Sequence, residues 1–448
     1  MILQPLSMSM MMKILGFSEG YHDAGVTLIE NGEILYASHA ERYSKKKNDR
    51  LIHPHQIKES DVVVFYEKSF LKNIRRLYSG QGWKRRKTTI PYDYAYSHHQ
   101  SHAAAGYFTS PFDDCNILVI DAIGEWDTIS IWDGIQKVIS WKYPYSLGLL
   151  YSAVTHRIGL KPNEDEYITM GMAAYGEPIY DLSELLSRNN HKGLGNYKPN
   201  AREEDLAASV QFLYEKELLS LVELCPKDNL ILMGGCALNC VANSKIKNKN
   251  IWIMPNPGDA GSSLGAASLY YGEKLNWVDP YLGYELPRSN PKKIVKELLK
   301  SGVCGVASER AEFGPRALGN RSLLADCRLD IKDKVNEIKR RQKYRPFAPA
   351  ILEEYADEYF DGPMNEYMQF VSYAKHDYDS VTHVDGTSRV QLVKPNCKSV
   401  IREILEEWYN KTGVPMLLNT SLNIKGMPMV NDEMDVKNFM KRYEVNVL

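Results

Sequence analysis

Apolar runs separated by turn residues predict two similar strand units in the first half of the chain. In KILGFSEGYHDAGVTLIENGEILYASHAE, three apolar runs are typical of strands, and Asn31-Gly32 supplies the positive φ that a two-residue hairpin needs. About a hundred residues later, NILVIDAIGEWDTISIWDGIQKVISW repeats this order, with Asp121 after the first strand and Asp133-Gly134 at the hairpin. We therefore expect a duplicated unit, although two unrelated hairpins would leave a similar pattern.

A duplication of this kind is typical of the actin-like ATPase fold, in which paired hairpins face the phosphates of a nucleotide. Two later turns fit that arrangement. NLILMGGCALNCVANSKI places Gly234-Gly235 between an apolar strand and a helical stretch, where backbone N–H groups can approach a phosphate closely. MPNPGDAGSSLGAASLYY then sets Asp259 in a turn directly before a helix of small residues.

The pattern changes between Pro280 and Pro291, which indicates a domain boundary. The stretch PYLGYELPRSNP has prolines, a glycine and little periodicity, as interdomain linkers do. After it, an amphipathic helix leads into a strand, and the rest of the chain has the size of a second α/β domain. We place the domains at 12–282 and 292–448, and we expect the folded part to begin near Met12, after a leader.

Composition narrows the classes of protein without choosing one. The 448 residues are 44% hydrophobic, which is enough for a core in each domain. Lys and Arg number 55 against 56 Asp and Glu, so the net charge requires neither nucleic acid nor a membrane surface as partner. The 7 cysteines include no C-x-x-C pair, which predicts a reducing, cytoplasmic setting. We recognise no secretory signal and no membrane-spanning segment.

The stretch YSHHQSHAAAGYF holds the first candidate chemistry. On a helix, His98 and His102 share one face, as helical histidine pairs that bind divalent metals do, while His99 points elsewhere. The pair alone leaves open a metal site or a polar helix surface. Asp121 and Asp259 could each complete a set of two imidazoles and two carboxylates. Such mixed ligands suit iron, manganese or zinc, and the sequence does not choose among them.

The C-terminal part is rich in cations set among glycine, proline and apolar residues. Guanidinium groups held by rigid turns suit the recognition of phosphate or carboxylate. Some of these side chains will instead be surface charges or partners in ion pairs, Arg340 and Lys343 first among them. The candidate cations in SERAEFGPRALGNRSLLADCR and VNEIKRRQKYRPFAPAILEE are Arg310, Arg316, Arg321, Arg328, Lys339, Arg341 and Arg345.

These motifs, in this order, resemble the ATP-dependent O-carbamoyltransferases of the nodulation-factor and antibiotic-tailoring type. The resemblance extends along nearly the whole chain from Met12 on. The matching stretches are HDAGVTLIENGEILYASHAERYSKKKND, HHQSHAAAGYFTSPF, DAIGEWDTIS, EYITMGMAAYGEP, GGCALNCVAN, PNPGDAGSSLGAA, EFGPRALGNRSLLAD, RPFAPA, HVDGTSRVQ and LLNTSLN. The resemblance implies an α/β chain, with a duplicated actin-like (ASKHA) N-terminal domain followed by a YrdC-like α/β C-terminal domain.

The resemblance also implies separate tasks for the two domains. The second is expected to convert carbamoyl phosphate and ATP into carbamoyl-adenylate and pyrophosphate. The first is expected to pass the carbamoyl group to a hydroxyl of a small-molecule or nucleotide-like acceptor and to release AMP. By the same resemblance, the metal is Fe(II), with Mg(II) alongside ATP as a further option. The implied metal ligands are His98, His102, Asp121 and Asp259.

Further site residues follow from the matched motifs. His22 and Asp23 match the family's HD pair and are implied to orient the hydroxyl or accept its proton, a turn cap being the alternative for Asp23. The implied nucleotide contacts in the first domain are Gly234, Gly235, Asn239 and Gly258. In the second domain, the implied phosphate-binding and nucleotide-binding residues are Arg310, Arg316, Lys339, Arg345, Arg389, Asn419 and Ser421.

Some residues depart from the family pattern. Ile168 stands where lysine is expected, which favours a different acceptor. Glu309 and Ala311 replace the usual glycine and methionine, and Gln342 replaces a glutamate. Two basic runs, KKKNDR and WKRRKTT, could attract a phosphorylated acceptor, the alternative being solvated surface.

Two other functions stay open. A tRNA threonylcarbamoylation enzyme would need a strongly basic surface, which the net charge of −1 does not favour. A catalytically silent nucleotide-binding regulatory protein would have little use for the complete ligand set and the arginines. The sequence does not give the acceptor, the passage of the adenylate between domains, or the oligomeric state, for which a homodimer is one option.

Overall fold

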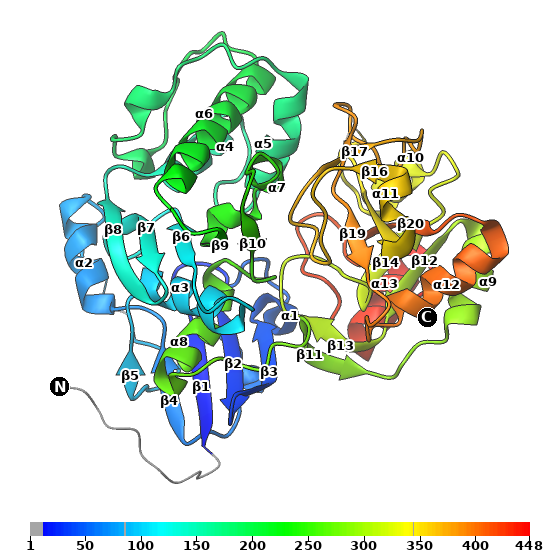
Figure 1. Cartoon of the computed structure of the whole chain (residues 1–448), viewed down its shortest axis with the longest axis horizontal. Coiled ribbons are helices and arrows are strands. Elements are labelled where there is room, and N and C mark those ends of the chain that lie inside the picture. The colour runs from blue at the N-terminus through cyan, green and yellow to red at the C-terminus, as the bar shows by residue number, and fades with distance from the viewer. Residues whose placement is uncertain (1–11, 85–86, 344) are drawn as a thin grey trace.

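The computed structural model describes residues 12–84, 87–343 and 345–448. The expected leader before Met12 and two residues of the run WKRRKTT lie outside these ranges. An N-terminal part built on two sheets lies beside a C-terminal part built on a third (Figure 1). Within the described ranges, no helix is long and apolar enough to cross a membrane.

The two N-terminal sheets share one topology, which confirms the expected duplication. Three antiparallel strands form one side of each sheet, and two further strands extend it in parallel from the first strand. The first sheet has the order β3-β2-β1-β4-β5 and the second β8-β7-β6-β9-β10. Their strands are β1 (Lys13–Ser18), β2 (Gly25–Glu30), β3 (Glu33–His39), β4 (Val62–Phe65), β5 (Tyr94–Ala95), β6 (Asn116–Ile120), β7 (Asp127–Asp133), β8 (Gln136–Lys142), β9 (Asn229–Met233) and β10 (Asn250–Trp252).

The predicted hairpin turns are present in both copies. Asn31 and Gly32 have φ of 49° and 82°, and Gly134 has φ of 55°. These left-handed conformations are those that asparagine and glycine adopt most readily, so the local sequence determines where β2 turns into β3 and β7 into β8.

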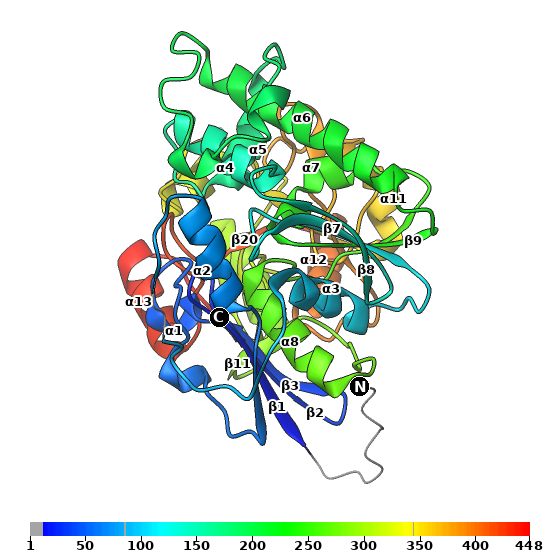
Figure 2. The same cartoon turned by 90° about the vertical axis from the view of Figure 1, so that its left-hand side faces the viewer.

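Two helices of small residues pack against each other between the sheets (Figure 2). They are α3 (His98–Thr109) and α8 (Ser262–Tyr271). A Cβ at Gly265 would lie 1.7 Å from the carbonyl oxygen of Ser101, so the two backbones are in direct contact. Ala103, Ala104 and Ala105 allow the same close approach on α3, and this packing places the first turn of α3 beside the start of α8.

The remaining N-terminal helices cover the second sheet and the edges. The second core lies between that sheet and helices α4 and α6, and includes Leu118, Ile120, Leu150, Val154 and Leu206. The N-terminal α-helices other than α3 and α8 are α1 (Glu41–Ser44), α2 (Ser69–Tyr78), α4 (Leu147–Arg157), α5 (Glu166–Met172), α6 (Glu203–Glu223) and α7 (Cys240–Asn243).

The C-terminal part is a mixed sheet with helices on both faces. Its order is β12-β14-β20-β15-β19, and only the β15–β19 pair is parallel. Helices α9 and α12 bury Trp408 against one face, and Val335 and Phe439 of α10 and α13 belong to the other core. The elements are α9 (Pro291–Ser301), β12 (Val303–Ala307), β14 (Arg321–Ala325), α10 (Lys332–Ile338), β15 (Ala348–Leu352), α11 (Ala356–Tyr359), β16 (Phe360–Asp361), β17 (Ser372–Ala374), β18 (Thr387–Ser388), β19 (Gln391–Val393), α12 (Ile401–Thr412), β20 (Met416–Ser421) and α13 (Glu433–Tyr443).

The segment predicted as a linker contains a strand. β11 (Tyr281–Leu286) pairs with β13 (Glu309–Glu312), and it also packs against β3. The register shifts between Tyr281 and Glu285, which breaks the alternation by which a strand is recognised in a sequence. The expected fold class is confirmed: the chain is α/β, with a duplicated N-terminal unit of actin-like topology and a separate C-terminal α/β sheet.

Candidate functional site

Two histidines and two aspartates from distant segments meet in a buried cluster. His98 and His102 lie on the first turns of α3, as predicted, with their Nε2 atoms 3.2 Å apart. Asp121 follows β6 directly, and Asp259 opens the 3-10 turn Asp259–Gly261 that leads into α8. One ligand atom from each of the four lies within 4.8 Å of the others. The predicted grouping is therefore brought together, and we call it the His–Asp cluster.

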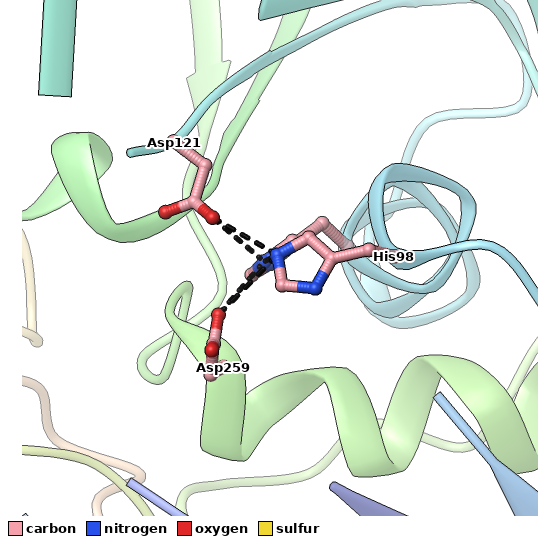
Figure 3. Close-up of side chains that lie close together, drawn as sticks. His98, Asp121 and Asp259 are labelled. Carbon is pink, nitrogen blue, oxygen red and sulfur yellow. Dashed lines mark hydrogen bonds and ion pairs between the residues drawn. The ribbon is translucent and has the colours of Figure 1, made fainter. Parts of the chain in front are cut away.

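The distances within the His–Asp cluster are those of direct polar contacts. His98 Nε2 is 2.9 Å from Asp121 Oδ2 and 3.5 Å from Asp259 Oδ1. His102 Nε2 is 3.4 Å from Asp259 Oδ1. Figure 3 shows the two carboxylates pointing at the imidazole of His98 from separate turns. All four side chains are buried.

Hydrogen bonds around the cluster orient its members. His102 donates from Nδ1 to the carbonyl of Pro257 at 3.0 Å, which leaves its Nε2 lone pair facing the cluster. Asp121 accepts the N–H of Gly235 at Oδ1 and turns Oδ2 inward. Both carboxylate oxygens of Asp259 are buried without a hydrogen-bond partner among the described residues. Such a carboxylate is costly, and a divalent cation held by these four ligands would satisfy it.

The pKa shifts describe a cluster that holds positive charge. Burial lowers the pKa of His98, but Asp259 and Asp121 outweigh burial and raise it to about 9. Burial would raise the pKa of Asp121, yet the hydrogen bond and charge of His98 hold it well below its usual range. Two carboxylates thus stabilise a cation beside the imidazoles, either a proton or a metal ion. His99 faces away, as expected, with its Nδ1 2.7 Å from Ser130 Oγ.

Glu125 supports the cluster, and our sequence analysis did not identify it. Its carboxylate accepts the backbone N–H of His98 at 3.0 Å and that of Lys68 at 2.7 Å. It therefore caps the start of α3, where the N-cap residue Ser97 makes no side-chain bond. Glu125 also holds the start of α2 against the start of α3. A carboxylate within the glycine turn after β6 was the available signal.

Glu67 is a second supporting residue that sequence analysis missed. It lies two residues after the end of β4, and Asp121 lies directly after β6, so its place just past an apolar strand was the signal. Its Oε2 lies 4.0 Å from His98 Nδ1, and it pairs with the ammonium of Lys72, which also lies over the ring of Tyr21 at 5.3 Å. Burial, together with Asp259 and Asp121, raises the pKa of Tyr21 to about 12.

The predicted pair His22 and Asp23 points in two directions. His22 Nε2 lies 4.0 Å from Asp259 Oδ2, at the border of the His–Asp cluster, and its side chain is 29% exposed. Asp23 instead accepts a hydrogen bond from His39 Nδ1 at 2.8 Å, while His39 Nε2 accepts one from Asn256 at 2.9 Å. Asp23 has φ of 49° and closes the turn, which fits the alternative stated for it.

The glycine turn after β9 lies directly beside the cluster. Gly234 has φ of 90°, and a Cβ there would lie 2.2 Å from the carbonyl oxygen of Ile120, so no larger residue fits. The N–H of Gly235 binds Asp121, whereas Gly258 borders open space on its Cβ side. Asn239 caps α7 by accepting the N–H of Ala242 at 3.0 Å, and its amide bonds to the side chain of Gln211.

A second cluster consists of cations from the C-terminal part. None of its members forms an ion pair with a carboxylate in the described part of the chain. Burial and Arg389 lower the pKa of Arg316 to about 9, and burial and Arg345 lower that of Arg341 to about 8. We call this group the basic cluster; it comprises Arg316, Lys339, Arg341, Arg345 and Arg389.

The basic cluster contacts the N-terminal part at α5 and α7. The guanidinium of Arg345 lies 4.8 Å from the ring of Tyr167, and Arg389 contacts the thiol of Cys240. Cys240 follows the glycine turn that binds Asp121, so a short run of chain separates the basic cluster from the His–Asp cluster. Lys339 donates to the carbonyl and the side-chain oxygen of Asn423 at 3.0 and 2.9 Å.

Other predicted contact residues lie elsewhere or make internal bonds. Arg310 is outside the basic cluster, where it donates to the carbonyls of Leu35 and Leu282 at 2.7 and 2.6 Å. Asn419 donates to the side chain of Gln391 at 2.7 Å, and Ser421 accepts from Lys339.

The remaining two candidate arginines have structural roles, and two of the departures occupy defined positions. Arg321 is fully buried and donates to backbone carbonyls, and Arg328 pairs with Asp326. Glu309 has φ of 47°, which explains the usual glycine at this position. Ile168 is 2% exposed on α5, next to Tyr167.

Comparisons with known proteins identify related chains. The family model described as carbamoyltransferase N-terminus matches residues 56–202 and 187–268, and that described as carbamoyltransferase C-terminus matches residues 295–448. An uncharacterised protein of Synechocystis sp. is 32% identical over 98% of this chain and 95% of its own. Nodulation protein NolNO of Sinorhizobium fredii is 29% identical over 92% of this chain and 76% of its own. Among solved structures, the ADPNP-bound activator of a 2-hydroxyisocaproyl-CoA dehydratase from Clostridium difficile matches with a TM-score of 0.41 and 16% identity, over 58% of this chain and 95% of its own.

Proposed function

The chain belongs to the carbamoyltransferase family, and from this premise we propose that it is an ATP-dependent O-carbamoyltransferase acting in the cytoplasm. Residues 292–448 make carbamoyl-adenylate from carbamoyl phosphate and ATP. Residues 12–282 transfer the carbamoyl group to a hydroxyl of a small-molecule or nucleotide-like acceptor. The proposed metal is Fe(II), with Mg(II) accompanying ATP.

Activation of the carbamoyl group takes two successive displacement reactions. Water cleaves carbamoyl phosphate to carbamate and phosphate, and a carbamate oxygen then attacks the α-phosphorus of ATP. The bond from the α-phosphorus to the bridging oxygen breaks, and pyrophosphate leaves. The second step brings two anions together, so the site has to offset their repulsion. Guanidinium groups such as Arg316, Arg345 and Arg389 suit this task because they bind phosphate oxygens in pairs.

The observation that carries this proposal is the absence of carboxylate partners from the basic cluster among the described residues. Arg328 and Arg402, which have structural roles, pair with Asp326 and Glu354. Arg316 and Arg389 instead lie near each other with half-buried side chains, and their mutual repulsion is unfavourable until an anion binds. A polyphosphate or carbamoyl phosphate supplies that anion.

The transfer step takes place at the His–Asp cluster. The acceptor hydroxyl oxygen attacks the carbamoyl carbon, the bond from that carbon to the adenylate oxygen breaks, and AMP leaves. The hydroxyl proton goes to His22, whose partly exposed Nε2 borders the cluster. Asp23 acts as a positioning residue through its bond to His39. A metal held by His98, His102, Asp121 and Asp259 would supply positive charge to the adenylate phosphate.

Phosphate and pyrophosphate release test the proposal. The purified protein is incubated with ATP and either carbamoyl phosphate or threonine plus bicarbonate, without an acceptor. We expect phosphate and pyrophosphate in equal amounts with carbamoyl phosphate. Release with threonine plus bicarbonate alone would assign the chain to tRNA threonylcarbamoylation. No release under either condition, even with hydroxyl compounds added, would favour the catalytically silent protein.

A matched pair of variants links release to the basic cluster. Arg316→Ala removes one cation of the cluster and should slow pyrophosphate release by about 100-fold or more. Lys343→Ala removes a cation that is exposed and paired with Asp333 and Glu337, and should leave the rate within about twofold. Equal rates in the two variants would remove Arg316 from the donor site.

A further inference from the structure

Helix α2 presents its apolar side to solvent and its charged side to the protein. Leu71, Ile74 and Leu77 recur at helical spacing and are 40, 39 and 53% exposed. Lys72 and Arg75, on the opposite side, are 4 and 2% exposed. A helix that packs on a domain normally has the reverse arrangement, so this apolar stripe is not explained by the fold of the chain.

Aromatic residues extend the stripe. Phe70 and Tyr78 are 66 and 68% exposed, and Trp83, in the loop after α2, is 52% exposed. The rings of Phe70 and Trp83 are in edge contact, with centroids 6.1 Å apart. Contiguous exposed apolar surface of this size is a feature of interaction sites. We call this surface the α2 face; it comprises Phe70, Leu71, Ile74, Leu77, Tyr78 and Trp83.

The inner side of α2 explains why the apolar residues stay outside. Lys72 pairs with Glu67. Arg75 donates to the carbonyl of Glu125 at 3.2 Å and to Gln81 at 2.8 Å, and it contacts His191 at 3.2 Å. Turning the helix to bury its apolar side would break these buried charged contacts. The outward orientation of the α2 face is therefore built into the fold.

The chain around the α2 face is basic. The segment from Lys68 to Tyr92 contains eight Lys and Arg and no Asp or Glu, in a chain whose net charge is −1, and only Lys72 and Arg75 among the described members of this set are buried. Lys68 and Lys87 are exposed, and neither forms an ion pair within the described ranges. Apolar and aromatic side chains next to cations are the composition of helices that lie on anionic bilayers.

We propose that the α2 face docks the protein onto the surface of an anionic lipid bilayer. Phe70, Leu77 and Trp83 enter the boundary between head groups and acyl chains, and Lys68 and Lys87 lie at the level of the lipid phosphates. This contact requires no spanning helix. A second copy of the chain is the weaker occupant, because a symmetric contact would bring two basic segments together.

Docking would take place next to the candidate transfer site. The N–H groups of Lys68 and His98 both donate to Glu125, so the start of α2 and the start of α3 are held by one carboxylate. The inference does not depend on the proposed carbamoyl chemistry, and binding can be measured without substrates.

Co-sedimentation with vesicles tests the proposal on the full-length protein. One set is pure phosphatidylcholine and the other contains about 30% phosphatidylglycerol, because anionic lipid is the expected attraction. We expect at least about tenfold tighter binding to the anionic vesicles, weakened by added salt. Equal binding to both sets, or binding to neither, would overturn the proposal.

Variants separate the α2 face from exposed apolar residues in general. Phe70→Ser/Leu77→Ser should weaken vesicle binding by about tenfold or more. Phe212→Ser/Leu224→Ser on and after α6, at sites 56 and 48% exposed, should leave it unchanged. Lys68→Glu/Lys87→Glu should weaken binding, and Lys292→Glu/Lys293→Glu on α9 should not.

Folding and self-association are controlled in the same samples. Circular dichroism and pyrophosphate release should be the same in the α2 variants as in the parent protein, so that lost binding is not lost folding. If sedimentation equilibrium shows a dimer that Phe70→Ser/Leu77→Ser dissociates, and vesicle binding is unaffected by that variant, the α2 face is a contact between two copies and the lipid proposal is wrong.

Discussion

The His–Asp cluster is fully buried and the basic cluster is half-buried around a buried Lys339, and their charges are arranged in opposite ways. In the first, two carboxylates accompany two imidazoles and raise the pKa of His98 to about 9 against the effect of burial. In the second, no carboxylate accompanies the five cations in the described structure, and burial and Arg389 lower the pKa of Arg316 to about 9.

This difference indicates which charge each cluster would bind. Burial disfavours the charged form in both clusters, so the neighbouring charges decide the direction of the pKa shift. Both oxygens of Asp259 lack a hydrogen-bond partner among the described residues, which a cation would offset, whereas Arg316 and Arg389 repel each other until an anion binds. The charges thus favour a cation at the His–Asp cluster and an anion at the basic cluster, on either side of the Gly234–Asn239 turn.

The largest expected effect is the loss of the metal from an Asp259→Ala variant. Removing one of four ligands should lower metal affinity by about 100-fold or more and abolish carbamoylation of the acceptor, while pyrophosphate release continues. Metal content after dialysis and the two activities are measured on the same sample. Asp133→Ala, at a side chain 54% exposed, is the control. Retention of the metal by Asp259→Ala would remove this residue from the ligand set.

The next effect contrasts stability with activity at Arg389. Because Arg389 is half-buried beside other cations, Arg389→Leu should raise the free energy of unfolding by about 1 kcal/mol. The same variant should reduce pyrophosphate release by about 100-fold. Arg402→Leu is the matched control, since Arg402 pairs with Glu354 and Glu406 and its loss should destabilise the protein without affecting release. Denaturant unfolding that shows Arg389→Leu to be the less stable of the two would mean that Arg389 is a structural residue.

All four members of the His–Asp cluster were candidates from the sequence because their signals are local. A histidine pair at helical spacing, an aspartate after an apolar strand and an aspartate in a glycine turn can each be read from a few residues. The paired hairpins were recognised for the same reason, through Asn31-Gly32 and Gly134. In contrast, β11 was read as a linker because a register shift removes its alternation.

Tertiary contacts were not accessible from the sequence. Nothing local distinguishes Arg310, which binds backbone carbonyls, from Arg316, which has no partner in the described chain. Glu125 was overlooked because its importance lies in capping a helix that begins 27 residues earlier. The direction of α2 was equally hidden, since an amphipathic pattern does not reveal which side faces the protein.

A smaller effect is expected from Glu125→Gln, which keeps one acceptor oxygen but removes the charge beside the first turn of α3. The N–H of His98 loses a charged partner, and we expect metal affinity to fall by about tenfold. Metal titration into the dialysed protein measures the change. Glu217→Gln is the control, because Glu217 on α6 also accepts a hydrogen bond, from the hydroxyl of Tyr145. An unchanged affinity would limit Glu125 to a role in folding.

The smallest effect is a rise in stability with pH, the direction that the lowered pKa values of the basic cluster produce. Burial, with Arg341 and Arg345, lowers the pKa of Lys339 well below its ordinary value. Lysine in the unfolded chain has a pKa of about 10.4. Between the lower folded pKa and this unfolded pKa, the unfolded state binds more protons, so the free energy of unfolding rises with pH. The rise is at most about 1.4 kcal/mol per pH unit.

Calorimetry of the parent protein and Lys339→Met at about pH 7.5 and 9.5 isolates this contribution, because other groups cancel in the difference. The parent should gain more stability with pH than the variant, and pyrophosphate in the buffer should reduce the gain by restoring the proton on Lys339. Equal gains in the two proteins would mean that Lys339 keeps its proton when folded. The acceptors Ser421 and Asn423 would then outweigh burial, and the basic cluster would carry its full charge without a ligand.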